Sequence, residues 1–149
     1  MRVLHLVKTT HGGIWVVRLT RELVRMGVEV HVVAPLDGPM VERYRASAVV
    51  LHDLQTDLPV RSPTRTLRLL RDFRALVDDV RPDLIHSHFV GTTLTARLAL
   101  GRDHPVPRLF QVAGPLHMEH AVFRAVDLRS AGDADYWLGT CKWTTAAYR

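Results

Sequence analysis

Two adjacent glycines, Gly12 and Gly13, form the segment of this chain best suited to bind a phosphate or a sugar hydroxyl. They follow the apolar stretch Arg2–Val7 and precede an amphipathic segment that begins at Ile14. A glycine turn before a helix leaves backbone N–H groups unobstructed by a Cβ, at the positive end of the helix dipole. The spacing does not match the G-x-G-x-x-G dinucleotide fingerprint. A tight turn that needs glycine only for its backbone geometry is an equally good interpretation.

Histidines provide a second group of side chains suited to ligand binding. His86 and His88 are two positions apart on an apolar stretch, so both side chains lie on the same face of a strand. Together with His117 and His120 they would supply the nitrogen ligands of a metal site. The sequence has neither an H-E-x-x-H helix nor a closely spaced cysteine pair. We therefore favour contacts with a polar ligand, or imidazoles satisfied within the core, and expect no metal.

Further residues have side chains capable of catalysis. Glu119, near His117, would serve as a general base, although a carboxylate near a helix start is favoured by the helix dipole alone. Ser87 does not form a catalytic pair with His88, because adjacent residues on a strand point to opposite faces. Cys141 near a helix start would have a lowered pKa, but a small buried residue is the favoured interpretation.

The sequence alternates between strand-like and helix-like segments with short breaks. Apolar runs predict strands at Arg2–Val7, Val28–Ala34, Ala48–Leu51, Asp83–His88, Arg108–Val112 and Tyr136–Gly139. Helical spacing predicts helices at Ile14–Met26, Pro63–Val80, Thr92–Leu100, Ala121–Arg129 and from Lys142 onward. The residues of the first helix expected to face the sheet are Val16, Leu19, Leu23 and Met26. This alternation predicts an α/β fold with a Rossmann-like parallel sheet and helices on both faces.

The loops after the predicted strands carry most of the residues that suit ligand binding. In open α/β sheets, ligands bind beyond the carboxyl ends of the strands. These loops contain glycines, imidazoles and one carboxylate, namely Gly12, Gly13, His88, Gly114, His117, Glu119 and His120. Their common place at one edge of one sheet predicts a single site for a polar, oxygen-rich ligand. In particular, His88 and the Gly12–Gly13 turn should belong to one pocket.

Four stretches of the chain, in order, resemble a known family. The first, Gly12–Val33, is similar to a "GG…L…L…GHEV.VV" opening, and the second, Arg81–His88, is close to "PDIIHSH". The third, Val106–Pro115, is similar to "VPVVVTVHGP", and the fourth, Ala134–Cys141, is similar to "AD.VIAVS". On these motifs the chain resembles the N-terminal half of a family-4, GT-B-fold retaining glycosyltransferase.

The resemblance implies transfer of a hexosyl group from a nucleotide-sugar to an acceptor hydroxyl, without a cofactor or a metal. It implies that residues 1–149 form one acceptor-side domain, whose partner is a C-terminal domain holding the nucleotide and an acidic E…E motif. By position, Gly12, Gly13 and Gly114 would approach the donor phosphate and sugar. His11 and His88 would bind the acceptor. Without the donor-binding domain, the isolated chain is expected to be nearly inactive.

One residue departs from the family pattern. The family histidine that contacts the donor sugar is aligned with Ala113, whereas Gly114 and Pro115 are retained. His117 lies a few residues further on and would reach the same space by folding back, so His117 and Glu119 are the catalytic candidates. A second interpretation is a non-catalytic sugar- or phosphate-binding module of the same fold. A flavodoxin-like interaction domain is a third, although the first strand does not lead into the acidic pocket of a receiver.

Composition narrows the class of protein. With 149 residues and a hydrophobic content of 47%, the chain suits one globular domain and is not a disordered segment. A single cysteine, no signal-peptide pattern and no apolar run long enough to span a membrane favour the cytoplasm. The net charge of +5 favours anionic partners such as phosphates or acidic lipids.

The same composition bears on macromolecular partners. The arginines between Arg61 and Arg74 leave a peripheral membrane contact as an alternative to a solvated helix face, which is favoured. Aromatic residues make up 7% of the chain and do not interleave with the arginines, so no nucleic-acid partner is expected. Aromatic residues near the end, including Tyr136 and Trp143, leave two alternatives, a homodimer and a monomer that covers them itself.

Overall fold

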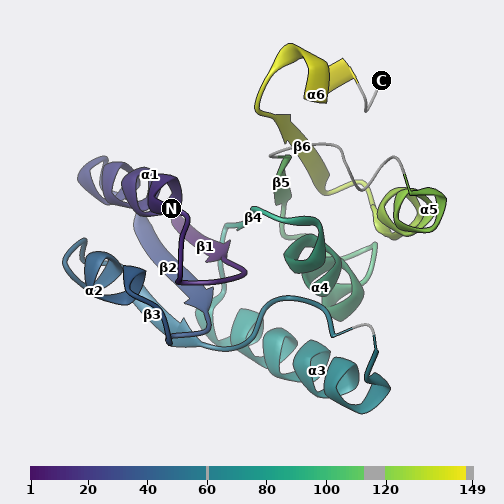
Figure 1. The fold of residues 1–149 in the computed structure, drawn as a ribbon, viewed down its shortest axis with the longest axis horizontal. Coiled ribbons are helices and arrows are strands. Elements are labelled where there is room, and N and C mark those ends of the chain that lie inside the picture. The colour runs from purple at the N-terminus through teal and green to yellow at the C-terminus, as the bar shows by residue number, and fades with distance from the viewer. Residues whose placement is uncertain (60, 113–119, 147–149) are drawn as a thin grey trace.

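The computed structural model describes residues 1–59, 61–112 and 120–146, which form six strands alternating with six helices (Figure 1). The strands are β1 (Arg2–Leu6), β2 (Glu29–Ala34), β3 (Val50–Asp53), β4 (Leu84–Ser87), β5 (Arg108–Val112) and β6 (Asp135–Gly139). The helices are α1 (Ile14–Arg25), α2 (Met40–Arg45), α3 (Pro63–Val80), α4 (Val90–Leu100), α5 (Ala121–Ser130) and α6 (Lys142–Ala146). Within these ranges, no helix combines the length and the apolar character needed to cross a membrane.

The strands form one parallel sheet in the order β3-β2-β1-β4-β5-β6. The chain runs outward from β1 to β3, crosses back through α3, and then runs outward in the other direction from β4 to β6. β1 and β4 are therefore neighbours at the point where the strand order reverses. Open α/β sheets bind ligands at this point. The predicted α/β, Rossmann-like fold class is confirmed.

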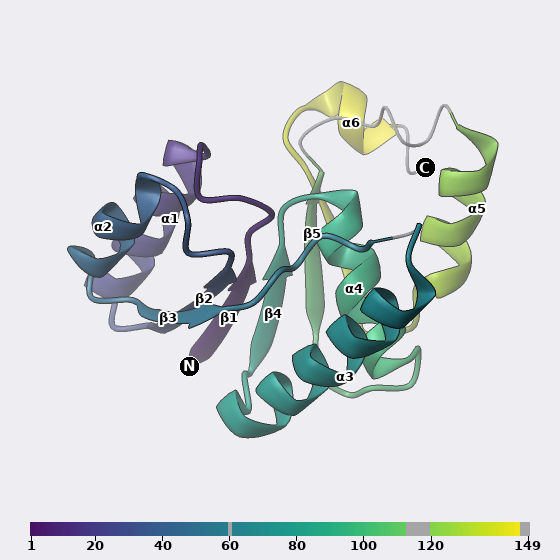
Figure 2. The same cartoon turned by 60° about the horizontal axis from the view of Figure 1, so that its bottom comes forward.

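Helices cover both faces of the sheet, as expected for strands that are apolar on both sides (Figures 1 and 2). α1 and α2 cover one face around the buried ring of Tyr44, and α3 and α4 cover the other around Phe73. Side chains alternate along β1, so Leu4 packs in the Phe73 cluster and Val7 packs in the Tyr44 cluster. By the same alternation, His5 lies on the face that α1 covers.

A buried network of ion pairs, rather than apolar packing, holds α5 to the sheet. Asp127 is the buried residue of this helix. Arg97 of α4 donates to Asp127 at 2.5 Å and to Asp135 of β6 at 2.9 Å. Arg108 of β5 donates to the other carboxylate oxygen of Asp135 at 2.7 Å. Two guanidinium groups and two carboxylates thus neutralise one another between α4, α5 and the last two strands.

Most of the predicted elements are present, with shifted ends. Helix α3 has the predicted bounds, and α4 begins at Val90, two residues before the predicted start. The predicted strand Ala48–Leu51 begins too early, because Ala48 has a φ of 56°, which is outside the extended region, and β3 starts at Val50. Helix α2 was not predicted, because its six residues are too short to show a repeating apolar stripe.

The buried face of α1 also differs from the prediction. Met26, which was expected to face the sheet, is 78% exposed, because α1 ends at Arg25 and Met26 is its C-cap. The buried residues of this helix are Val16, Val17 and Thr20. Gly27 comes next with a φ of 80°, so it ends the helix as a glycine in the left-handed region does.

Candidate functional site

The Gly12–Gly13 turn connects β1 to α1 at the carboxyl edge of the sheet. Gly13 is the N-cap of α1 and has a φ of 79°, in the left-handed region that favours glycine. Gly12 does not have a positive φ, and a Cβ added there would meet no atom within 4 Å. Gly13 is thus required by the turn itself, whereas the open space at Gly12 leaves the backbone accessible to a ligand.

A set of hydrogen bonds holds this glycine turn against the loop after β2. The hydroxyl of Thr10 donates to the backbone oxygen of Pro35 at 2.7 Å and accepts from the N–H of Gly38 at 2.9 Å. The N–H of Met40 donates to the carbonyl of Thr10 at 3.0 Å. A Cβ at Gly38 would overlap the backbone of Thr10, so the close approach of the two loops depends on glycine. These contacts hold Thr10, which precedes the glycine turn, against the loop after β2.

Charged side chains flank the glycine turn. Nζ of Lys8 lies 3.0 Å from a carboxylate oxygen of Asp57. Nε2 of His11, a predicted acceptor-binding residue, lies 3.4 Å from Oδ1 of Asp37, and both side chains are exposed. His11 therefore lies on the surface of the turn, where a ligand from solvent can reach it.

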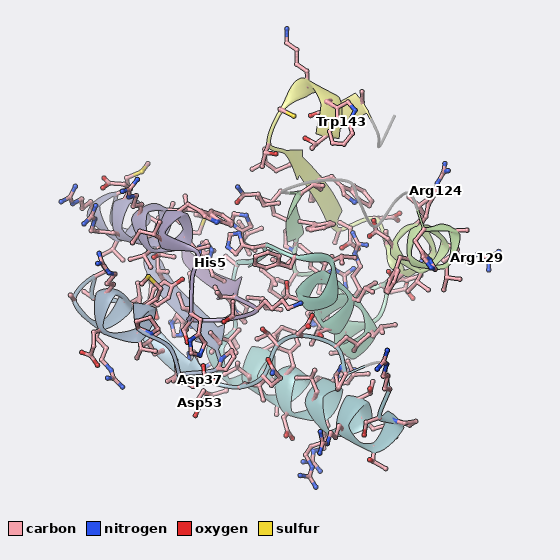
Figure 3. All side chains as sticks on the ribbon, viewed as in Figure 1. His5, Asp37, Asp53, Arg124, Arg129 and Trp143 are labelled. Atoms are coloured by element: carbon pink, nitrogen blue, oxygen red, sulfur yellow. The ribbon has the colours of Figure 1, made fainter. Side chains whose placement is uncertain are left out.

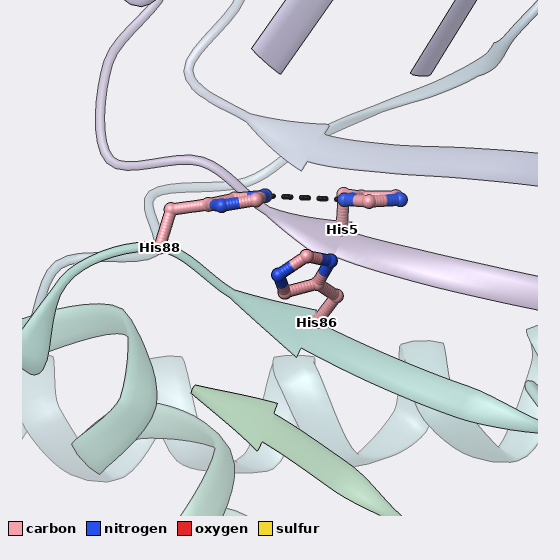
Figure 4. A group of neighbouring side chains, drawn as sticks. All are labelled: His5, His86 and His88. Carbon is pink, nitrogen blue, oxygen red and sulfur yellow. Dashed lines mark hydrogen bonds between the residues drawn. The ribbon is translucent and has the colours of Figure 1, made fainter. Parts of the chain in front are cut away.

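Three buried histidines lie at the junction of β1 and β4 (Figure 4). The strand register pairs His5 with His86, and His88 follows two residues later. Nδ1 of His5 and Nε2 of His88 share a hydrogen bond of 3.1 Å, and their rings are stacked. The ring of His86 lies beneath this pair, with its centroid 4.9 Å from that of His5 and 4.3 Å from that of His88. We refer to these three residues as the histidine cluster.

Trp15 connects the histidine cluster to the glycine turn. The rings of Trp15 and His88 form a T-shaped contact with a centroid distance of 4.9 Å and an interplanar angle of 81°. Trp15 belongs to the first turn of α1, directly after Gly13 and Ile14. His88 and the Gly12–Gly13 turn therefore lie at the same edge of the sheet, as predicted. The single pocket that they should share and their binding roles stay predictions.

Burial keeps the imidazoles of the histidine cluster neutral. It lowers the pKa of His5 to about 3 and that of His86 to about 4, and it lowers the pKa of His88 well below its usual value. The neighbouring imidazoles lower the pKa of His5 and His88 further, and the Gln111 side chain opposes the shifts of His86 and His88 only in part. At neutral pH each ring therefore has one N–H and one lone pair.

The cluster has unused hydrogen-bonding capacity. Among the described residues, Nε2 of His5, Nε2 of His86 and Nδ1 of His88 are buried without a hydrogen-bond partner. Neutral imidazoles can both donate to and accept from hydroxyl groups, and they can coordinate a metal ion. Their low pKa values make them weak general bases at neutral pH. The arrangement is suited to binding rather than to proton transfer.

The sequence prediction missed His5 as a site residue. A lone histidine within the apolar run of the first strand reads as a core residue, and only the strand order brings it next to His86. His120, which was predicted to join His86 and His88, is exposed at the N-cap of α5. The centroid of its ring lies 5.3 Å from that of Phe123. Other predicted site residues lie outside the described residues, namely Ala113, Gly114, His117 and Glu119.

Two smaller predictions have different outcomes. Ser87 packs on the opposite side of β4 from the histidine cluster, with its Oγ 2.7 Å from Oγ1 of Thr93, so no catalytic pair with His88 exists. Cys141 is exposed, which corrects the prediction of a buried residue, because it precedes α6 beyond the edge strand. Hydrogen bonds from Thr144 lower the pKa of its thiol.

Comparison with known proteins identifies related sequences and folds. The sequence profile of one family, described as Glycosyltransferase Family 4, matches residues 12–148. No curated protein sequence matches the chain.

Solved structures are similar in fold. A protein assigned as a UDP-N-acetylglucosamine 2-epimerase from Listeria monocytogenes has 15% identity and a TM-score of 0.69, with 99% of this chain and 41% of that chain covered. A glycosyltransferase from Rickettsia africae has 11% identity and a TM-score of 0.69, with 97% of this chain and 38% of that chain covered. MurG from Acinetobacter baumannii has 15% identity and a TM-score of 0.62, with 87% of this chain and 39% of that chain covered. At such identities the likeness shows the fold, one half of the GT-B architecture, and the chain spans about two fifths of each of these proteins.

Proposed function

Because the chain belongs to Glycosyltransferase Family 4, we propose that it is the acceptor-side, N-terminal domain of a nucleotide-sugar-dependent retaining glycosyltransferase. The reaction moves a hexosyl group from the donor to an acceptor hydroxyl, and it requires neither a resident cofactor nor a metal. The observation that carries this proposal is the meeting of the Gly12–Gly13 turn and the histidine cluster at the β1–β4 edge.

The donor phosphate is proposed to approach the glycine turn. The open space at Gly12 and the backbone N–H groups at the start of α1 offer hydrogen bonds to an anion, and the helix dipole adds a favourable field. Gly114 is assigned to the same role by the family resemblance alone. The Thr10 hydrogen bonds hold the turn in place, so little reorganisation is needed when the donor binds.

The acceptor hydroxyl is proposed to lie near His88 and His11. His88 offers a neutral imidazole at the base of the site, and His11 lies at its exposed rim. The low pKa of His88 argues for hydrogen bonding to the acceptor rather than for proton abstraction. The catalytic candidates remain His117 and Glu119, on the strength of the resemblance.

The proposed enzyme needs further partners. A donor-binding domain must stabilise the charge on the leaving nucleotide, so the chain alone should transfer little or no sugar. The single cysteine fits a reducing compartment, and we place the reaction in the cytoplasm. A homodimer is a further proposal. A peripheral membrane contact is another, through the exposed arginines of α3, which include Arg65 and Arg68.

A non-catalytic sugar- or phosphate-binding module is the second candidate. The observation that favours it is Ala113, which stands where the family has a donor-contacting histidine. The two candidates predict different coding sequences beyond Arg149. A reading frame that continues into an E…E motif supports the transferase, and an immediate stop supports the binding module.

Transfer of radiolabel from a panel of nucleotide-sugars to sugar and lipid acceptors tests the proposal. The protein encoded by the complete reading frame should transfer one of these sugars, and the 149-residue chain should not. Gly12→Ala should reduce transfer at least tenfold at a subsaturating donor concentration, whereas Glu22→Ala, on the exposed side of α1, should leave it unchanged. Equal transfer by the Gly12→Ala variant, or robust transfer by the chain alone, would contradict the proposed roles.

A further inference from the structure

We propose that His5, His86 and His88 form a binding site for a divalent transition-metal ion at the junction of β1 and β4. One ring nitrogen from each residue lies within 4.8 Å of the other two, and all three side chains are buried. The site comes from two strands that are neighbours in the sheet and more than 80 residues apart in the sequence. This inference does not depend on the glycosyl-transfer reaction.

The separation of the two nitrogens that join His5 and His88 is close to that of two ligands in a metal site. Two nitrogens bound to one tetrahedral zinc ion lie about 3.3 Å apart, since each Zn–N bond is about 2.05 Å long. Nδ1 of His5 and Nε2 of His88 lie 3.1 Å apart. A shared metal ion can therefore replace their shared proton if the nitrogens separate by a few tenths of an ångström and each ring turns its lone pair toward the ion.

His86 supplies the third ligand. Figure 4 shows its ring beneath the hydrogen-bonded pair, with its nitrogens on the side that faces His5 and His88. Its nitrogen must approach from at most 4.8 Å to the ligand separation of about 3.3 Å, which a side-chain rotation can provide. Three imidazoles with an open fourth position are a common ligand set for zinc.

One nitrogen of the cluster is available to an ion without the loss of a hydrogen bond. Among the described residues, Nε2 of His86 is buried without a hydrogen-bond partner, whereas Nδ1 of His5 and Nε2 of His88 would give up the hydrogen bond that they share. The buried amide oxygen of Gln111, beside His86 and His88, can accept from the N–H of a ligating ring.

The ligand types select the kind of metal. Imidazoles alone suit Zn²⁺, Co²⁺, Ni²⁺ and Cu²⁺, whereas Mg²⁺ and Ca²⁺ require oxygen ligands that the cluster does not contain. The sequence predicts no metal because it has neither an H-E-x-x-H helix nor a closely spaced cysteine pair, and the candidate ligands considered there did not include His5. The inclusion of His5 changes that expectation.

A second histidine pair provides an internal control. Nδ1 of His31 and Nε2 of His52 are 2.9 Å apart, and these rings are also stacked. The other nitrogen of His31 is bonded to Glu29 at 3.0 Å, and no third imidazole joins this pair within the described chain. His52→Gln therefore removes a paired histidine without touching the proposed site.

Calorimetric titration of the chelator-treated protein, prepared without a polyhistidine tag, with Zn²⁺ alone at pH 7.5 tests the proposal. The wild type and His52→Gln should bind one Zn²⁺ per chain with equal affinity, and Mg²⁺ should not bind. His5→Gln, His86→Gln and His88→Gln should each weaken binding by more than about 100-fold, because loss of even an outer partner of a ligand weakens binding 10- to 100-fold. Equal affinity in these three variants and the wild type would overturn the proposal.

A spectroscopic measurement on the wild type keeps the test independent of whether the variants fold. Co²⁺ should give the visible d–d bands of a site with four or five ligands, and Zn²⁺ should remove them by competition. A thiolate-to-metal charge-transfer band would place the ion on Cys141 instead and would refute the site. The absence of Zn²⁺ or Co²⁺ binding by the folded wild type would refute it as well.

Discussion

Nη1 of Arg97 in α4 lies 2.5 Å from Oδ1 of Asp127 in α5, and both side chains are fully buried. On the same helix as Asp127, Val122 and Phe123 are exposed, so the attachment of α5 depends on this ion pair more than on apolar contact. The second carboxylate, Asp135, bonds to Arg97 and Arg108 and extends the pair into the sheet. Loss of a single charged side chain from this network should therefore weaken the attachment of α5 and β6 to the rest of the protein.

Asp127→Ala should lower the free energy of unfolding by about 3–5 kcal/mol, because it leaves the buried guanidinium of Arg97 partly uncompensated. Urea unfolding followed by circular dichroism measures the loss. The control is Glu22→Ala, which breaks an exposed pair with Arg25 and should cost less than about 1 kcal/mol. A loss in Asp127→Ala no larger than in the control would show that the network does not hold α5.

Tyr44 should make the protein labile at high pH. Burial raises the pKa of its phenol to about 12, whereas the unfolded chain has a tyrosine pKa near 10. Between these values the unfolded state binds fewer protons than the folded state, so stability falls as the pH rises above 10. Tyr44→Phe should remove this part of the pH dependence.

The same substitution removes a buried hydroxyl that has no hydrogen-bond partner among the described residues. At pH 7, Tyr44→Phe should therefore leave the free energy of unfolding unchanged or raise it by up to about 1 kcal/mol. Thermal unfolding of both proteins from pH 7 to 11 checks the two effects together. If the melting temperatures of the wild type and Tyr44→Phe fall in parallel above pH 10, the pKa of Tyr44 is not raised.

The sequence predicts the architecture well because apolar runs and glycine or proline breaks are local signals. The bounds of α3 follow from Pro63 at its first position and Pro82 after its end. The residues of the candidate site are harder to predict from local sequence patterns. His5 is recognised as a site residue only because it is paired with His86 across β1 and β4. This pairing depends on the order of the strands and not on any local sequence pattern.

Exposure at element ends is also difficult to predict. Met26 continues the helical spacing of α1, but the chain turns at Gly27 before Met26 can reach the core. Cys141 is a small apolar residue in an apolar context, yet it lies beyond the edge strand, where no described element covers it. Both outcomes depend on where an element stops rather than on residue type.

Gly12→Ala should separate ligand binding from folding. The added Cβ meets no atom within 4 Å and the backbone does not have a positive φ, so stability should change by less than about 0.5 kcal/mol. Nucleotide-sugar affinity should fall at least tenfold, because the Cβ occupies the approach to the backbone. Gly13→Ala, with its positive φ, should instead destabilise the chain by about 1 kcal/mol or more. An unchanged affinity in Gly12→Ala would remove this glycine from the donor site.

The region of β6 and α6 should drive self-association. Tyr136 and Trp143 are 57% and 63% exposed, Leu138 is 47% exposed, and β6 is an edge strand of the described sheet. Figure 3 shows Trp143 at the periphery of the molecule. Light scattering should give a mass that rises with concentration, and Leu138→Lys should reduce that rise. A monomer mass over a wide concentration range would show that the chain does not associate through this surface.

Backbone amide NMR of the 149-residue chain, titrated with nucleotide-sugars and with sugar acceptors, tests the central claim most directly. The account predicts that shifts concentrate in residues 8–15 and 86–92, because the glycine turn and the histidine cluster meet at the β1–β4 edge. Shifts confined to another surface, such as the hollow lined by Leu54, Arg65 and Arg68, would contradict the claim.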